Sequence, residues 1–201
     1  MKLYFSPGAC SLVPHIVVRE TAAQVDLLKV DLKQHRTEAG DDYYAINPKG
    51  QVPLLVLDDE STLSEGPVIA QYIADQANAT TLAPAAGSMA RYRVMEWQNY
   101  ITSELHKSFS PLFKPDTPDN VKATALTVLT KKFEWVDSQL AGREYLTGAN
   151  FTIADAYLFV VAAWAKKVGP SLDHLAHLQA FLARVAARPA VQAALKAEGL
   201  A

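Results

Sequence analysis

The first twenty residues, MKLYFSPGACSLVPHIVVRE (1–20), set the pattern from which the fold is predicted. Lys2–Phe5 is a short β-prone run, and Ser6-Pro7-Gly8 interrupts it. Across Ser11–Glu20 the apolar residues recur at helical spacing. The stretch therefore predicts a strand, a turn and a helix, with Cys10 between the turn and the helix.

Strand and helix signals continue to alternate as far as about residue 78. Further strands are expected at Leu27–Asp31, Val52–Leu57 and Thr62-Leu63, and a helix at Gly66–Gln76. The order β-α-β, then β-β-α, suits a small sheet with helices packed against it.

The rest of the chain shows only helical patterns. Residues 79–87 are mostly small and predict a linker between a first domain at 1–78 and an all-helical domain at 88–201. Thr152-Ile153-Ala154-Asp155 predicts a capping box at a helix start. Helices are expected at 88–109, 119–141, 152–168, 175–187 and 189–198.

Composition narrows the class of protein. Half of the 201 residues are hydrophobic and the net charge is only -2, so the chain lacks the basic face that nucleic-acid binding requires. No apolar run approaches the roughly 18 residues that span a bilayer, and the N-terminus does not resemble a secretory signal. A single cysteine cannot form an internal disulfide. We expect a cytoplasmic protein with no nucleic-acid or membrane partner.

Cys10 is the first candidate for chemistry. A thiol near a helix N-terminus can have its pKa lowered, because backbone N–H groups and the helix dipole stabilise an anion. The alternative is a small buried hydrophobic side chain. No second cysteine is present, so any redox cycle requires an external thiol.

Two polar segments could bind a peptide ligand. A proline in Gln51-Val52-Pro53, just before a strand, can adopt the cis form and expose neighbouring backbone groups. Glu65-Gly66 joins a carboxylate to the N–H groups of a helix start, where an ammonium and a carboxylate could bind. Taken alone, the first segment is more often the start of an edge strand, and the second is more often an ordinary helix first turn.

The helical half offers His106 as a hydrogen-bond donor or base, although a histidine near a helix end is most often a surface residue. Phe109, Phe113 and Trp164 could line an apolar pocket, or could be core. His174 and His177 share a possible helix face, but no further ligand is apparent, and we expect no metal site.

Together these segments resemble the glutathione transferase family, and specifically its bacterial beta class. The likeness covers essentially the whole chain in order. It is carried by the opening residues 1–11, Asn47–Pro53, Leu63–Gly66, Glu104–Lys107 and Phe151–Asp155.

The resemblance implies a thioredoxin-like N-terminal domain, β-α-β-α-β-β-α, followed by an all-helical domain, in a homodimer with each glutathione site between the domains. It implies that glutathione, as co-substrate, is bound by the backbone of Val52 beside a cis Pro53, and by Glu65 and the Gly66 N–H. Cys10 would lie close to the sulfur, with His106 opposite. The other glutathione-contact positions are His35, Gln51, Asn99 and Ser103.

Three positions depart from the family pattern. His35 stands where a lysine commonly reaches the glycyl carboxylate, which makes that contact weaker or pH-dependent. Gly66 replaces a serine, so only its backbone remains for binding. Ser103 occupies a position that is often acidic.

The implied activity is conjugation of glutathione to small hydrophobic electrophiles, a detoxification reaction. Ser11, the helix N-terminus and His106 would lower the pKa of the glutathione thiol, and Cys10 could add thiol–disulfide exchange. The electrophile would be held near Lys107, Phe109, Phe113, Trp164 and Lys167. The alternatives are a glutathione-dependent reductase or dehalogenase and a non-catalytic binding module on the same fold.

Overall fold

A computed structural model describes all 201 residues and divides them into two compact units. The first comprises Met1–Ala83 together with Arg188–Ala201, and the second comprises Pro84–Ala187. The last residues, which the sequence pattern had grouped with the helical domain, therefore pack with the first unit.

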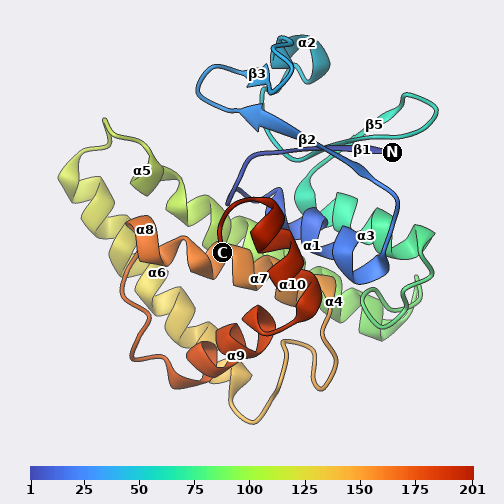
Figure 1. The fold of residues 1–201 in the computed structure, drawn as a ribbon. Helices are drawn as coiled ribbons and strands as arrows, with labels where there is room; N and C mark the ends of the chain where they lie inside the picture. The colour runs from blue at the N-terminus through green and yellow to red at the C-terminus, as the bar shows by residue number, and fades with distance from the viewer. The chain divides into compact units, whose positions relative to one another are not determined.

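The first unit is built on a five-stranded sheet of order β3-β2-β1-β4-β5 (Figure 1). β1 and β2 are parallel, with Leu3 opposite Leu27, and the other pairs are antiparallel. The strands are β1 (Lys2–Phe5), β2 (Asp26–Asp31), β3 (Arg36–Thr37), β4 (Leu54–Val56) and β5 (Thr62–Ser64).

Both faces of this sheet are covered. Successive side chains of a strand point to opposite faces, so Leu3 and Tyr4 belong to different parts of the core. Tyr4 packs with Tyr43 and Val30 on the side of α2 (Tyr43–Ile46). The helices α1 (Leu12–Thr21) and α3 (Gly66–Gln76) pack against each other, and Figure 1 shows them on one side of the sheet.

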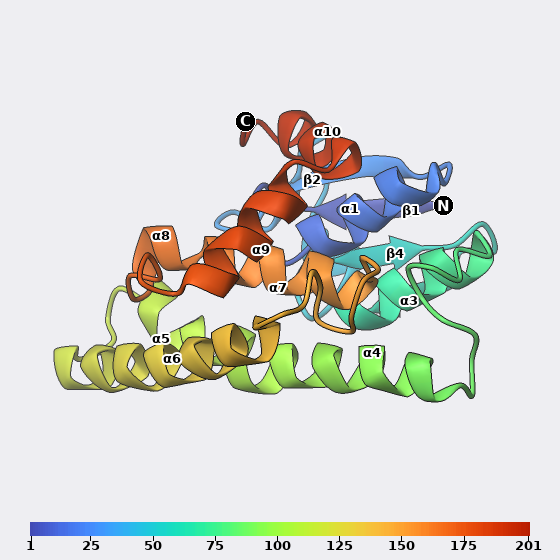
Figure 2. The same cartoon turned by 90° about the horizontal axis from the view of Figure 1, so that it is seen from below.

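The C-terminal helix α10 (Pro189–Ala197) packs along α1, so α1 lies between α3 and α10 (Figure 2). Two polar contacts join the C-terminal segment to α1. Arg188 pairs with Glu20 through two bonds of 2.7 and 2.9 Å, and Glu198 contacts His15. These contacts explain why this segment belongs to the first unit.

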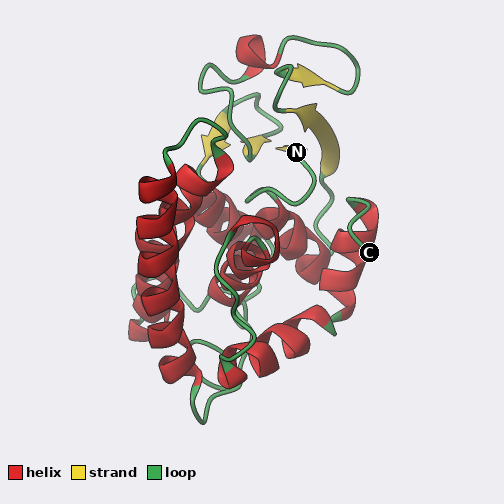
Figure 3. Cartoon of the chain, turned by 90° about the vertical axis from the view of Figure 1, so that its left-hand side faces the viewer, coloured by secondary structure: helices red, strands yellow, loops and turns green.

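The second unit contains helices and loops only (Figure 3). Its centre is α7, in which every residue from Ile153 to Ala162 is buried, and α4, α9 and the π-helical turn pack against it. The elements are α4 (Met89–Tyr100), the π-helical turn η1 (Ile101–His106), the 3-10 turn η2 (Lys107–Phe109), α5 (Ser110–Phe113), α6 (Asp119–Leu140), α7 (Ile153–Ala163), α8 (Ala165–Val168) and α9 (Ala176–Ala186).

The predicted capping box at the start of α7 is confirmed. The carboxylate of Asp155 accepts the N–H and hydroxyl of Thr152 at 2.7 and 2.8 Å, and the N–H of Leu146 at 2.8 Å. Burial raises the pKa of Asp155 to about 6, although these donors act in the opposite direction.

The sequence pattern missed several features of the fold, among them α5 and the division at Trp164 of the helix expected at 152–168 into α7 and α8. The two-residue strand β3 and the four-residue helix α2 are too short to show a period. The helix expected at 88–109 is α-helical only to Tyr100 and continues as η1 and η2. None of the helices is both long and apolar enough to cross a membrane.

Candidate functional site

The loop before α1 is closed by the buried hydroxyl of Ser11. This hydroxyl accepts the N–H of Ser6 at 3.1 Å and donates to the Ser6 carbonyl at 3.2 Å. Ser11 has no exposed surface. Its hydroxyl is therefore engaged in shaping the loop, and the expected part of Ser11 in lowering the pKa of the glutathione thiol stays a prediction.

Cys10 is half-buried, and its Sγ–H donates to the carbonyl oxygen of Val52 at 3.3 Å. Burial, with a smaller contribution from the charge of Glu65, raises the pKa of the Cys10 thiol to about 11 against the lowering effect of the Cys10 and Ser11 N–H groups. The expectation of a lowered pKa is thus wrong, because desolvation outweighs the backbone N–H groups. At neutral pH the side chain is a thiol.

The Val52–Pro53 peptide bond is cis, as the resemblance implied. The preceding loop is fixed by the Tyr43 hydroxyl and the Asn47 side-chain amide, which donate to the Gln51 carbonyl at 2.9 and 2.7 Å. Val52 and Pro53 are buried, whereas Gln51 is exposed.

Gly66, the first residue of α3, brings these segments together. A Cβ atom built on Gly66 would lie 3.6 Å from the Pro53 ring and 3.9 Å from the Cys10 carbonyl oxygen. Cys10, Val52, Pro53 and Gly66 therefore surround one place, although they lie far apart in sequence. This convergence is the central geometric feature of the candidate site.

Glu65 lies beside this place in an unusual backbone conformation, with φ at +71°. Its exposed carboxylate pairs with the ammonium of Lys49 at 3.2 Å, and Lys49 also donates to the Ser64 hydroxyl at 3.1 Å. The site therefore already holds an ammonium group against Glu65.

His35 stacks on Tyr44, with ring centroids 4.3 Å apart and 3.2 Å between its Nε2 and the Tyr44 hydroxyl. Its Nδ1 is buried without a hydrogen-bond partner. Gly50 has a φ of +62°, and a Cβ there would lie 2.5 Å from the Tyr44 ring. The loop thus needs glycine at position 50 to leave room for this stack.

Sequence reasoning missed a buried carboxylate that supports the Cys10 loop. Glu198 accepts the N–H of Gly8 at 2.9 Å and the Nδ1–H of His15 at 2.8 Å, and the Glu198 and His15 side chains are fully buried. Arg19 Nε–H donates to His15 Nε2 at 3.3 Å, so the histidine proton is on Nδ1. The only signal was a histidine within an apolar helix, with no indication of its partner.

His106, in the second unit, ends the π-helical turn η1. Its Nδ1 lies 2.7 Å from the Tyr157 hydroxyl, and its ring meets Trp164 edge-on at 4.7 Å between centroids. Tyr157, on α7, was also missed, because its sequence context shows only a buried helix.

The predicted electrophile residues differ in exposure. Phe113 is 49% exposed and Trp164 is 7% exposed, with their rings 5.4 Å apart. Phe109 has no exposed surface and packs beneath them against Phe133, so it supports this cluster and does not line an open surface. Lys107 and Lys167 are exposed.

Asn99 and Ser103 are exposed one helical turn apart, and the Ser103 hydroxyl donates to the Asn99 carbonyl at 3.0 Å. Apart from this contact, neither side chain bonds to another of the predicted site residues. No group of three or more histidine, cysteine, aspartate or glutamate side chains is arranged to hold a metal ion.

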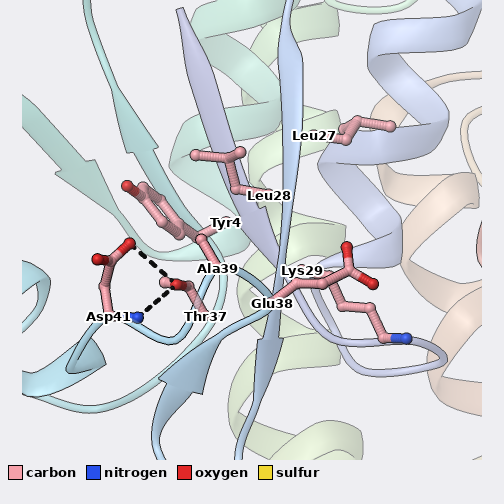
Figure 4. A pocket seen from close by; sticks show the side chains of 8 residues that line it. All are labelled: Tyr4, Leu27, Leu28, Lys29, Thr37, Glu38, Ala39 and Asp41. Carbon is pink, nitrogen blue, oxygen red and sulfur yellow. Dashed lines mark hydrogen bonds between the residues drawn. The ribbon is translucent and has the colours of Figure 1, made fainter.

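A cavity of about 360 Å³ lies elsewhere in the first unit (Figure 4). Thr37 and Asp41 bond to each other at its edge through their side chains and the Asp41 N–H. The lining residues are Tyr4, Leu27, Leu28, Lys29, Thr37, Glu38, Ala39 and Asp41. Because it contains none of the predicted site residues, the cavity is distinct from the candidate site.

Comparison with known proteins identifies the family. Residues 1–75 match the glutathione S-transferase N-terminal domain, and residues 100–189 match the C-terminal domain. The chain is 51% identical over 200 residues to glutathione S-transferase GstA of Escherichia coli O157:H7, with both proteins covered completely. The chain belongs to the glutathione S-transferase family.

Solved structures show which class of glutathione transferase the chain resembles. It superposes on a bacterial beta class enzyme of Sphingomonas chungbukensis with a TM-score of 0.96 and 46% identity, covering both chains completely. A sphingomonad glutathione S-transferase complexed with glutathione gives 0.95 and 49%, again over both complete chains. The predicted family, beta class, thioredoxin-like fold and enzyme type are confirmed.

Proposed function

We propose that this glutathione transferase binds glutathione where Cys10, Val52, Pro53 and Gly66 converge, and conjugates its thiol to small hydrophobic electrophiles. The convergence of these four residues is the observation that carries the proposal. The sphingomonad relative, whose structure contains glutathione, supports the choice of co-substrate.

The polar groups around this place match the γ-glutamyl end of glutathione. Glu65 would hold the γ-glutamyl ammonium, displacing Lys49, and the Gly66 N–H at the start of α3 would bind the adjacent carboxylate. Val52 would pair its backbone with the cysteinyl part. Gln51 and His35 would lie toward the glycyl end.

In the proposed reaction the glutathione thiol loses its proton to solvent or to His106, and the thiolate attacks the electrophilic carbon. A carbon–sulfur bond forms, and with a chloronitrobenzene the carbon–chlorine bond breaks and chloride leaves. Because Cys10 is protonated at neutral pH, it can turn its S–H from the Val52 carbonyl and donate a hydrogen bond to the glutathione thiolate. Phe113 and Trp164 offer aromatic contact for the electrophile.

Thiol–disulfide exchange through Cys10 is the second proposed activity, since Cys10 lies at the convergence point. The Cys10 thiolate would attack a mixed disulfide, releasing one thiol, and glutathione would then regenerate Cys10 as a thiol while forming glutathione disulfide. The raised pKa of Cys10 keeps its thiolate fraction small at neutral pH and therefore slows this exchange.

A homodimer is proposed from exposed apolar residues of the second unit. Met89, Tyr92 and Met95 are exposed on α4, and Trp135 on α6 stacks near Tyr100 at 4.6 Å. An exposed apolar surface of this kind is typical of an interface. Asn99, also on α4, is proposed to reach glutathione bound to the other subunit, and sedimentation equilibrium tests the dimer.

The substitution Glu65→Gln tests the proposed site. Removing this charge is expected to weaken glutathione binding about tenfold or more, because a charged hydrogen bond is lost. Calorimetric titration with glutathione and turnover of a chlorodinitrobenzene measure the effect. Glu60→Gln, in the nearby exposed turn, is the matched control and should change neither.

If the wild-type chain binds glutathione but turns over no electrophile and no mixed disulfide, the binding-module alternative replaces the proposal. Equal affinity in wild type and Glu65→Gln would place glutathione elsewhere.

A further inference from the structure

The segment that carries His106 has an irregular backbone. It passes from α-helix to the π-helical turn η1 and then to the 3-10 turn η2 within nine residues, from Ile101 to Phe109. π-helical turns are rare and occur frequently at functional sites, because they change the direction in which side chains project. Contacts from other elements of the unit can stabilise such a turn.

Lys132, on α6, supplies these contacts. Its ammonium donates to the Glu104 carbonyl oxygen at 2.8 Å and to the Ser108 hydroxyl at 3.1 Å, and it pairs with the Glu104 carboxylate at 2.9 Å. These three acceptors match the three protons of the ammonium. The Lys132 side chain is only 22% exposed, so solvent competes weakly for it.

The Ser108 hydroxyl completes the network by donating to the same Glu104 carbonyl at 2.7 Å. Glu104 and Ser108 lie two residues before and two residues after His106. The network therefore fixes the backbone on both sides of His106 from α6.

The His106 ring is held from a different element. Tyr157 of α7 lies 2.7 Å from His106 Nδ1, and Trp164 lies against the ring. Keeping this contact requires the backbone at His106 to stay in register with α7. Movement of the turn would carry the imidazole away from the Tyr157 hydroxyl.

We propose that Lys132 is a positioning residue that fixes the π-helical turn and thereby the orientation of the His106 imidazole. Its consequence for catalysis rests on the proposed function, in which His106 acts on the glutathione thiol. Its structural part concerns the second unit alone and can be tested without substrate.

The test compares Lys132→Met, which keeps the side-chain stem and removes the ammonium, with Lys132→Arg as the conservative variant. Lys131→Met, at the adjacent exposed position, is the control. Hydrogen exchange followed by mass spectrometry measures the backbone amides of residues 104–109. Turnover of glutathione with a chlorodinitrobenzene gives kcat and the KM for glutathione.

We expect exchange of this segment to become about tenfold faster in Lys132→Met, because charge-assisted hydrogen bonds to the turn are lost. We expect kcat to fall about tenfold while the KM for glutathione changes less than about twofold, since the proposed contacts of Val52, Glu65 and Gly66 with glutathione belong to the first unit. Lys132→Arg should restore most of kcat, and Lys131→Met should match wild type.

A second readout follows the His106 ring by NMR, through the chemical shifts of its ring protons beside Tyr157 and Trp164. These shifts should change in Lys132→Met and return toward wild type in Lys132→Arg. Unchanged exchange and unchanged His106 ring shifts in Lys132→Met would overturn the proposal. Faster exchange with an unaltered kcat would also overturn it, because the turn would then have no catalytic consequence. A wild-type chain with no turnover would contradict the proposed function, and the exchange and the ring shifts would still decide the role of Lys132.

Discussion

The loop before α1, which carries Cys10, and the π-helical turn that ends at His106 are both fixed by a distant charged side chain that bonds to the main chain. The two side chains have opposite charges and differ in burial. In the first, the Glu198 carboxylate accepts the N–H of Gly8 and is fully buried. In the second, the Lys132 ammonium donates to the Glu104 carbonyl and remains partly exposed. The comparison teaches that irregular backbone near a reactive group is held by charges from elsewhere in the same unit, and that burial decides how much each charge contributes.

The largest expected effect is on the buried arrangement. In Glu198→Gln the amide can accept only one of the two N–H donors that face it, and its own NH₂ meets the other. We expect the free energy of unfolding to fall by about 3 kcal/mol, against about 1 kcal/mol for Lys132→Met, whose contact is partly solvated. Urea denaturation of both variants measures the difference, and equal losses would break the comparison.

Arg19 sharpens this prediction. Because its Nε–H donates to His15 Nε2, it prevents the imidazole from moving its proton off Nδ1. In an Arg19→Leu background His15 can change tautomer and accept from the amide that Glu198→Gln introduces. Glu198→Gln should then cost at least about 1 kcal/mol less than in the wild-type background. The same loss in both backgrounds would contradict the tautomer assigned to His15.

Sequence alone predicted the features of the fold that depend on residues close together in the chain. β1 and α3 were predicted with their observed limits, and the capping box of Thr152 and Asp155 was predicted from four residues, since each depends on near neighbours. Cys10 and His106 were named as candidates by residue type and by resemblance. Their surroundings were not foreseen, because burial and distant partners determine them.

The missed features all depend on contacts between distant residues. Glu198 lies 183 residues from His15, and Lys132 lies 28 residues from Glu104, so no local spacing connects either pair. The pKa of Cys10 was predicted in the wrong direction for the same reason. The helix N-terminus was visible in the sequence, but the desolvation that outweighs it was not.

The next prediction concerns how burial in the loop before α1 affects the reactivity of Cys10. With a pKa of about 11, the thiolate fraction at pH 7 is roughly 100-fold smaller than for an ordinary cysteine. Alkylation of Cys10 by iodoacetamide should therefore be slow at pH 7 and rise about tenfold per pH unit without a plateau before pH 10. The folded chain favours the protonated thiol, so this stabilising contribution is present below the ordinary thiol pKa and is lost as the pH rises toward 11.

The control is the same chain unfolded in urea, where alkylation should level off near the ordinary thiol pKa. A plateau below pH 8 in the folded chain would show that the N–H groups of the loop outweigh desolvation. Cys10 would then be expected to act mainly in thiol–disulfide exchange, and less as a hydrogen-bond donor to the glutathione thiolate.

The smallest expected effect distinguishes the two groups of Glu104 that contact Lys132, the side-chain carboxylate and the main-chain carbonyl. Hydrogen bonding and charge from Lys132 lower the pKa of the Glu104 carboxyl, so this ion pair contributes at neutral pH and is lost as the pH falls through that lowered pKa. The carboxylate is exposed, and exposed pairs contribute little, whereas the main-chain carbonyl lies inside the π-helical turn. Glu104→Gln should therefore raise the exchange rate of residues 104–109 by less than about twofold at pH 7.

If Glu104→Gln instead matched Lys132→Met, Lys132 would act on a surface side chain and not on the main chain. The parallel with the Glu198 contact to Gly8 would then fail, because only the buried charge would be holding an irregular backbone.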